Sequence, residues 1–274
     1  MDRPFFIAGP CLIEGEEMLD AVAARLSAIG SSLDLRIILK GSFRKANRTS
    51  ITSTTTIGDL TALRILADCG ARHGLPTLTD IHTTDDASMA APFVDYLQIP
   101  AFLSRQTDLI LAAAATGKGL NIKKAQFSAP EDMIHVVEKA RIGGAREIFL
   151  CERGTSFGYH DLVVDMRGLI IMRDAGVPVV YDATHSVQRP SVGRESGGDR
   201  ALAIPLARAA AAVGIDGIFF ETHPDPDNAA SDRATQLPID DAAAMIRNVL
   251  AIDDARRRAE SASADPPTTQ ASTQ

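Results

Sequence analysis

Eight short apolar runs, separated by segments in which apolar residues recur at helical spacing, predict one closed (β/α)8 TIM barrel. A barrel of this class needs about 250 residues, and the chain has 274. The runs are apolar on both faces, as parallel strands covered by helices are. An open doubly wound sheet is the runner-up, but Ala8-Gly9-Pro10-Cys11 follows the first run in place of a Gly-x-Gly-x-x-Gly turn.

The predicted strands are rich in Val, Ile, Leu and Phe, and most are followed by a segment with helical periodicity. In chain order the strands are Phe5–Ala8, Arg36–Lys40, Pro76–Asp80, Tyr96–Ile99, Leu120–Lys123, Glu147–Cys151, Pro178–Asp182 and Gly217–Glu221. The helical segments include Met18–Ile29, Leu60–His73, Asp108–Thr116, Ala129–Ile142, Val163–Ala175, Leu202–Val213 and a final helix, Asp240–Ala255. The barrel domain is therefore predicted to cover residues 1–258. The polar Pro-, Ser- and Thr-rich segment 259–274 is predicted to be disordered.

Composition excludes several classes of protein. The chain is 45% hydrophobic and 23% charged, which is ordinary for a globular protein, and no run approaches the ~18 apolar residues of a membrane helix. The net charge of −7 argues against a nucleic-acid partner. The first residues contain too short an apolar stretch for a signal peptide, so a cytoplasmic location is expected. Cys11, Cys69 and Cys151 are odd in number and widely spaced, which argues against a disulfide framework.

Basic residues collect where the predicted strands end, which is where barrels of this class build their active sites. Lysine makes up only six of the 28 basic residues, yet four of the six lie at or just after the ends of the second and fifth strands: Lys40, Lys45, Lys123 and Lys124. Arg153 follows the sixth strand. Several cations buried together need counter-charges, so phosphates or carboxylates must neutralise them. A single basic residue here pairs more often with acidic helices, but the clustering favours a site for an anionic ligand.

Four potential metal ligands also follow strand ends or lie in the last loops. They are Cys11, His185, Glu221 and Asp232. A thiolate, an imidazole and two carboxylates suit Zn²⁺, Fe²⁺ or Mn²⁺. The competing interpretation is a buried Cys11 that only packs and an Asp232 that only caps a turn. Barrel closure would bring the first strand beside the last two, so we expect a metal site.

The chain resembles the 3-deoxy-D-manno-octulosonate 8-phosphate (KDO8P) synthase family over nearly the whole barrel. The matching segments occur in order along the chain: Ile7-Ala8-Gly9-Pro10-Cys11, Lys40-Gly41-Ser42-Phe43, Lys45-Ala46-Asn47-Arg48-Thr49-Ser50, Leu97-Gln98-Ile99-Pro100-Ala101-Phe102-Leu103, Asn121-Ile122-Lys123-Lys124, Glu152-Arg153-Gly154, Asp182-Ala183-Thr184-His185 and His223-Pro224-Asp225-Pro226-Asp227-Asn228-Ala229. So many ordered segments are specific to this family.

The resemblance implies condensation of phosphoenolpyruvate with arabinose 5-phosphate and water, in a homotetramer that serves lipopolysaccharide precursor synthesis. It places Lys40, Lys45, Gln98, Ala101, Lys123, Arg153 and His185 around phosphoenolpyruvate. It places Asn47, Arg48 and Thr49 on the sugar phosphate, with Arg105 supplied by a neighbouring subunit. The residues that the resemblance implies to be catalytic are Lys45, Asn47, Lys123, His185 and Asp232. In the metal-dependent branch of the family this position is a cysteine, so Cys11 implies a metal-dependent enzyme.

Some positions depart from the family pattern, and they border the sugar-phosphate side. Thr49 replaces the more usual serine, and Ile51–Gly58 lacks the usual Phe-Arg-Gly-x-Gly run. The acceptor could then be erythrose 4-phosphate, in a related synthase. The residues are also compatible with a class II aldolase, which uses a metal but releases no phosphate, and with a non-catalytic anion-binding barrel.

Overall fold

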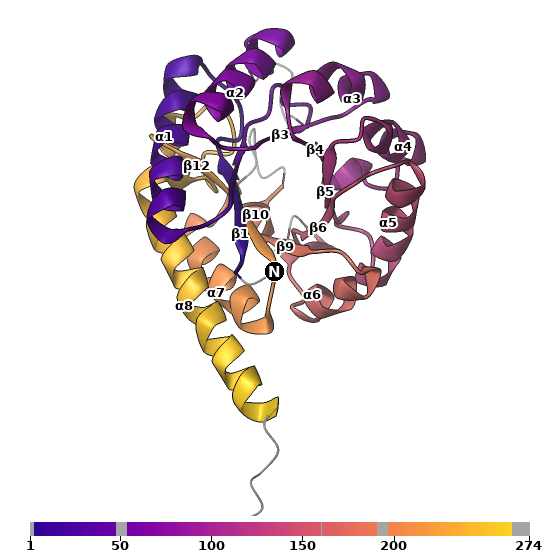
Figure 1. Ribbon diagram of the computed structural model, residues 1–274, viewed down its shortest axis with the longest axis vertical. Helices are drawn as coiled ribbons and strands as arrows, with labels where there is room; N and C mark the ends of the chain where they lie inside the picture. The colour runs from indigo at the N-terminus through magenta and orange to yellow at the C-terminus, as the bar shows by residue number, and fades with distance from the viewer. Residues whose placement is uncertain (1–2, 48–53, 160, 191–196, 265–274) are drawn as a thin grey trace, which may run out of the picture.

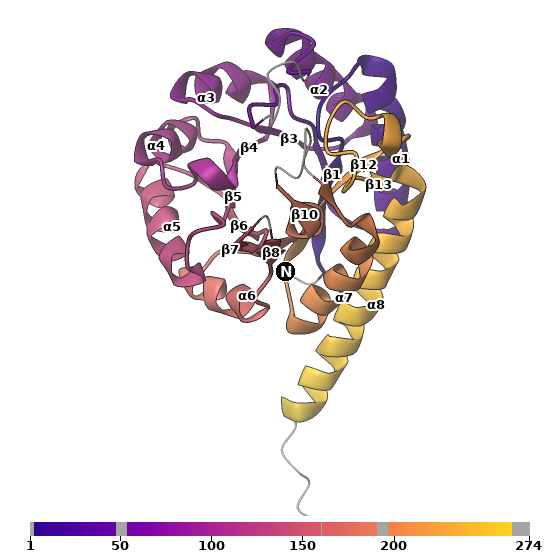
Figure 2. The ribbon, with the colours of Figure 1, turned by 180° about the vertical axis from the view of Figure 1, so that it is seen from behind.

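Parallel strands form the centre of the molecule, and helices surround them in a ring (Figures 1 and 2). The computed structural model describes residues 3–47, 54–159, 161–190 and 197–264. Strand β1 pairs in parallel with β2 on one side and with β12 on the other, which closes the sheet. The barrel strands are β1 (Phe5–Gly9), β2 (Ile37–Lys40), β3 (Thr77–Asp80), β4 (Tyr96–Ile99), β5 (Gly119–Lys123), β6 (Ile148–Glu152), β9 (Val179–Asp182) and β12 (Gly217–His223). The predicted (β/α)8 barrel is confirmed, and closure excludes the open sheet.

The surrounding helices follow the predicted order, with one additional helix. They are α1 (Glu16–Leu33), α2 (Asp59–His73), α3 (Thr84–Ala90), α4 (Thr107–Ala115), α5 (Met133–Ile142), α6 (Arg167–Ile171), α7 (Ala203–Val213) and α8 (Ile239–Ala264). Helix α3 was not predicted, because it is short and polar; it begins at a capping box between Thr83 and Asp86. The predicted start of the helical segment Val163–Ala175 is wrong. Val163 is instead the last residue of β8, and β-branched residues such as valine favour strands.

Several short strands lie at the carboxyl end of the barrel. A hairpin of β7 (Thr155–Gly158) and β8 (Asp161–Val163) follows β6, and β10 (Gln188–Arg189) pairs with β11 (Gly197–Gly198) after β9. Strand β13 (Leu237–Pro238) pairs with the end of β12. These additions lie in the loops that follow the strands, which is where barrels of this class vary for function.

Helix α8 is longer than the sequence predicted and runs past the ring of helices (Figure 1). Residues 259–264, expected to be disordered, continue this helix. Arg256 bonds Asp253 at 2.7 Å and Glu260 at 2.6 Å, three and four residues away, and such pairs support an exposed helix. In the part of the chain that the structure describes, no helix combines the length and apolar character that crossing a membrane requires.

The amino end of the barrel interior is closed by aromatic rings. Phe149 lies 4.6 Å from Phe5 and 5.5 Å from Tyr96, measured between ring centroids. The Arg36 guanidinium caps all three rings and bonds Glu147 at 3.1 Å. This apolar layer comprises Phe5, Ile7, Ile38, Leu78, Tyr96, Phe149, Cys151, Val180 and Phe219. The barrel interior beneath the carboxyl end is therefore lined by apolar side chains.

Candidate active site

A cavity of about 310 Å³ occupies the carboxyl end of the barrel. Every barrel strand contributes to it, either with a residue near its carboxyl end or with the loop that follows. Most of the predicted site residues line it: Cys11, Lys40, Lys45, Asn47, Gln98, Ala101, Lys123, Arg153, His185 and Glu221. The cavity is large enough for a small phosphorylated molecule, and its walls are predominantly polar.

The remaining predicted residues lie elsewhere. Asp232 is not among the residues that line the cavity but contacts Cys11, which does line it. Arg105 is exposed and outside the cavity of its own chain, so its expected role requires a neighbouring subunit. Arg48 and Thr49 lie outside the described residues.

Lys123 and His185 share one buried carboxylate. Lys123 Nζ lies 2.6 Å from Asp182 Oδ2, and His185 Nδ1 lies 2.8 Å from the same oxygen. Burial opposes ionisation of Asp182, but His185 and Lys123 outweigh it and hold the pKa of this carboxyl well below its usual range. Lys123 also packs over the Phe219 ring, 3.2 Å from its centroid. Both cavity side chains are therefore fixed in orientation by Asp182.

One donor of the Arg153 side chain has no hydrogen-bond partner in the part of the chain that the structure describes. The side chain is buried, Nη2 donates to Gln188 Oε1 at 3.2 Å, and Nη1 has no hydrogen-bond partner among the described residues. Burial lowers the pKa of Arg153, yet a guanidinium remains charged at neutral pH. An unpaired buried donor is costly, and a phosphate or carboxylate in the cavity would satisfy it.

Gln98 is held by a polar chain across the barrel. Its Nε2 donates to Asp80 Oδ1 at 2.6 Å, and its Oε1 accepts from Asn121 Nδ2 at 2.7 Å. Asp80 in turn accepts from the Ser42 hydroxyl. These bonds fix which way the Gln98 amide faces, so this wall of the cavity is ordered before a ligand binds.

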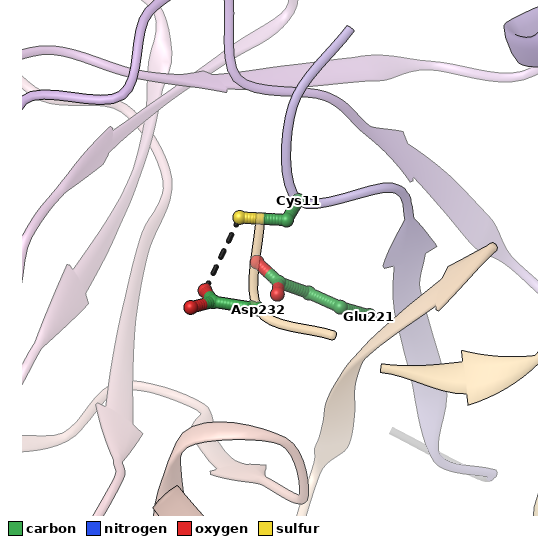
Figure 3. A group of neighbouring side chains, drawn as sticks. All are labelled: Cys11, Glu221 and Asp232. Carbon is green, nitrogen blue, oxygen red and sulfur yellow. Dashed lines mark hydrogen bonds between the residues drawn. The ribbon is translucent and has the colours of Figure 1, made fainter. Parts of the chain in front are cut away.

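Three candidate metal ligands, two of which line the cavity, come together (Figure 3). One donor atom from each of Cys11, Glu221 and Asp232 lies within 4.8 Å of the others, and Cys11 Sγ is 3.2 Å from Asp232 Oδ2. His185 Nε2 lies 3.7 Å from Glu221 Oε1 and 3.9 Å from Asp232 Oδ2. Glu221 Oε2 is buried and has no hydrogen-bond partner among the described residues. The soft and hard donors, and this orphaned oxygen, fit a borderline divalent ion.

The Cys11 side chain is buried beside two carboxylates. Burial, then the neighbouring carboxylates of Asp232 and Glu221, raise the pKa of Cys11. Only a thiolate binds metal strongly, so an ion that binds here must release the thiol proton.

Two lysines neutralise the same carboxylates. Lys40 Nζ lies 2.6 Å from Glu221 Oε1, and Lys45 Nζ lies 2.7 Å from Asp232 Oδ2. Burial disfavours both ammonium groups, but the carboxylates outweigh it and raise the pKa of Lys40 and of Lys45. The cations expected at the strand ends are therefore balanced by carboxylates of the barrel itself.

The expectation that Lys124 joins these cations is wrong. Its Nζ donates to Ala125 O at 3.1 Å, Ser128 O at 3.2 Å and Thr155 Oγ1 at 3.2 Å, so it ties the loop after β5 to β7. Neighbouring residues of a strand point to opposite faces, and here Lys123 takes the inward position.

Two glutamines that hold the site were not predicted. Gln236 Oε1 accepts from the Cys11 backbone N–H at 3.0 Å, while its Nε2 donates to Ser231 O at 2.7 Å. It thereby holds the loop of Asp232 against Cys11. Gln188 bonds Arg153 and donates to Asp232 Oδ1 at 3.2 Å. No sequence pattern marks either residue, because their partners lie far away in the chain.

Comparison with known proteins agrees with this geometry. The DAHP synthetase I family matches residues 1–254. The chain is 52% identical over 267 residues to 2-dehydro-3-deoxyphosphooctonate aldolase of Paracidovorax citrulli (strain AAC00-1), covering 94% of this chain and 93% of the relative. Proteins of the same name from Syntrophotalea carbinolica, 50% identical over 90% of both chains, and from Synechococcus sp., 52% identical over 90% of this chain and 87% of the relative, are similarly close. The chain therefore belongs to the DAHP synthetase I family, among the enzymes named 2-dehydro-3-deoxyphosphooctonate aldolase, the KDO8P synthases.

Proposed function

We propose that this barrel condenses phosphoenolpyruvate with D-arabinose 5-phosphate and water to give 3-deoxy-D-manno-octulosonate 8-phosphate and inorganic phosphate. The relatives' shared name supports this reaction. The observation that carries it is the buried Nη1 of Arg153, which has no partner among the described residues, in a cavity that Lys123 also lines. That arrangement is a prepared site for a phosphate or carboxylate.

In this reaction the methylene carbon of phosphoenolpyruvate attacks the aldehyde of the sugar, and water adds to the adjacent carbon. The bond between that carbon and the phosphate oxygen then breaks, which releases phosphate. Arg153 and Lys123 would hold the anionic groups of phosphoenolpyruvate and balance the charge that moves onto the leaving phosphate. Lys40, Gln98 and Ala101 complete this side of the cavity.

We further propose that Cys11, His185, Glu221 and Asp232 hold a divalent ion such as Zn²⁺, Fe²⁺ or Mn²⁺. The bond from His185 Nδ1 to Asp182 supports a tautomer in which Nε2 keeps its lone pair, and Nε2 faces Glu221 and Asp232. When bound, such an ion polarises a carbonyl group or lowers the pKa of water. The protein's part is to orient these four side chains.

The aldose is assigned to the side of the cavity at Asn47, with Arg48, Thr49 and Arg105 of a neighbouring subunit as further contacts. Asn47 lines the cavity. We propose the homotetramer that the family resemblance implies, in which the exposed Arg105 would reach the cavity of a neighbouring subunit. Three free, buried cysteines support a reducing, cytoplasmic location. The product's chemistry suits lipopolysaccharide precursor synthesis.

Phosphate release from phosphoenolpyruvate tests the proposed reaction. We expect release that requires an aldose phosphate and is faster with arabinose 5-phosphate than with erythrose 4-phosphate, together with an eight-carbon product by mass spectrometry. The Arg153→Met variant, purified identically, measures background phosphatase.

Each contrary outcome points to a different function. Faster release with erythrose 4-phosphate would indicate the related four-carbon synthase. Condensation without phosphate release would indicate an aldolase of another class, and no turnover with either sugar would indicate a barrel that only binds anions.

A further inference from the structure

The Lys45 ammonium lies among the candidate metal ligands. Its Nζ is 2.7 Å from Asp232 Oδ2 and 3.1 Å from Cys11 Sγ, while these two ligand atoms are 3.2 Å apart. An ion bound to Cys11 and Asp232 would meet the same two atoms. Two cations repel each other at such a distance, so Lys45 and a divalent ion compete for this position.

Lys40 and Lys45 differ in how firmly they are held. Lys40 Nζ bonds Pro10 O, Cys11 O and Glu221 Oε1, and its side chain is 1% exposed. Lys45 Nζ contacts only the two candidate ligands in the described residues, and its side chain is 12% exposed. Lys45 also stands in an irregular loop and lines the cavity. Lys45 is therefore the cation that can leave.

We propose that Lys45 is an exchangeable counter-cation: it neutralises Asp232 in the metal-free protein and turns toward the substrate anion when a divalent ion binds. The inference rests on the proposed metal site. On exchange, the ion binds the Cys11 thiolate and the carboxylates, the thiol proton passes to solvent, and the ammonium keeps its protons. The freed ammonium then faces the cavity that Arg153 and Asn47 also line.

This exchange couples the two sites. The metal can bind only to molecules in which Lys45 has left Asp232. Its apparent affinity is therefore the intrinsic affinity multiplied by the fraction of such molecules. An anion that holds Lys45 in the cavity raises that fraction, so metal and anion each strengthen the binding of the other by the same factor.

Titration with Cd²⁺, followed by the ultraviolet absorption of the cadmium–thiolate bond, tests the competition without reference to activity. Lys45→Met keeps the length of the side chain and removes the charge, so we expect it to bind Cd²⁺ about tenfold more tightly than the wild type. Lys118→Met is the matched control. It removes the same charge beside the amino end of β5, away from the cavity, and should match the wild type. Equal or weaker Cd²⁺ binding by Lys45→Met would overturn the proposal.

Calorimetry of phosphoenolpyruvate binding tests the coupling. In the wild type, Cd²⁺ should strengthen phosphoenolpyruvate binding, and Lys45→Met should lose most of that gain; an undiminished gain would contradict the exchange. Lys45→Gln replaces Lys45→Met if the latter melts early. If no variant shows the cadmium–thiolate band, the metal site and this inference both fail, while phosphate release in the presence of a chelator would leave the condensation reaction standing.

Discussion

Lys123→Met is expected to lower turnover by about 100- to 1,000-fold, the usual cost of removing one prepared charge from an active site. The reason is its position: Lys123 lines the cavity and is fixed by Asp182 at 2.6 Å. The loss should appear in phosphate release from phosphoenolpyruvate and as weaker phosphoenolpyruvate binding by calorimetry.

A double variant separates this effect from damage to the fold. Lys123→Met leaves the fully buried Asp182 without its lysine, which costs stability. Adding Asp182→Asn removes the unbalanced charge and should restore the melting temperature but not the binding of phosphoenolpyruvate. Unchanged kinetics in the single variant, or full recovery in the double variant, would contradict a role in holding the anion.

Cys11→Ala is expected to abolish cadmium–thiolate absorption and to reduce turnover at least 100-fold. Substitution of groups that only orient metal ligands costs about 10- to 100-fold, and loss of a ligand should cost more. Cys11 Sγ lies 3.2 Å from Asp232 and belongs to the group with Glu221. The measurement is phosphate release with and without added Mn²⁺ or Zn²⁺.

Cys69→Ala is the matched control, because Cys69 is also a buried free thiol but lies in α2, within the core. It should keep wild-type activity and the cadmium–thiolate band. Full turnover of Cys11→Ala in the presence of a chelator would show that the reaction does not require a metal at this site.

The strands were predictable because each is a short apolar run, and the observed bounds differ from the predicted ones by at most two residues at either end. Helix α3 was missed because Thr84–Ala90 has little apolar periodicity and is begun by a side-chain cap instead. Helix α8 was predicted too short, because its last turns are stabilised by charge pairs around Asp253 and not by an apolar face.

The site was predictable where it depends on strand ends. Lys40, Lys123 and Glu221 stand at or near the last residue of a strand, and barrel closure brings such positions together. The contacts between loops could not be predicted from the sequence. Contacts such as Cys11 with Gln236 join residues that are distant in the chain, and no periodicity records them.

A crystal structure with phosphoenolpyruvate and Cd²⁺ bound, the ion located by its anomalous scattering, tests most directly whether one cavity serves both anion and metal. We predict one strong anomalous peak among the side chains of Cys11, His185, Glu221 and Asp232. In the same crystal, phosphoenolpyruvate should contact Lys123 and Nη1 of Arg153. A cadmium peak away from Cys11, or phosphoenolpyruvate bound outside this cavity, would contradict the account.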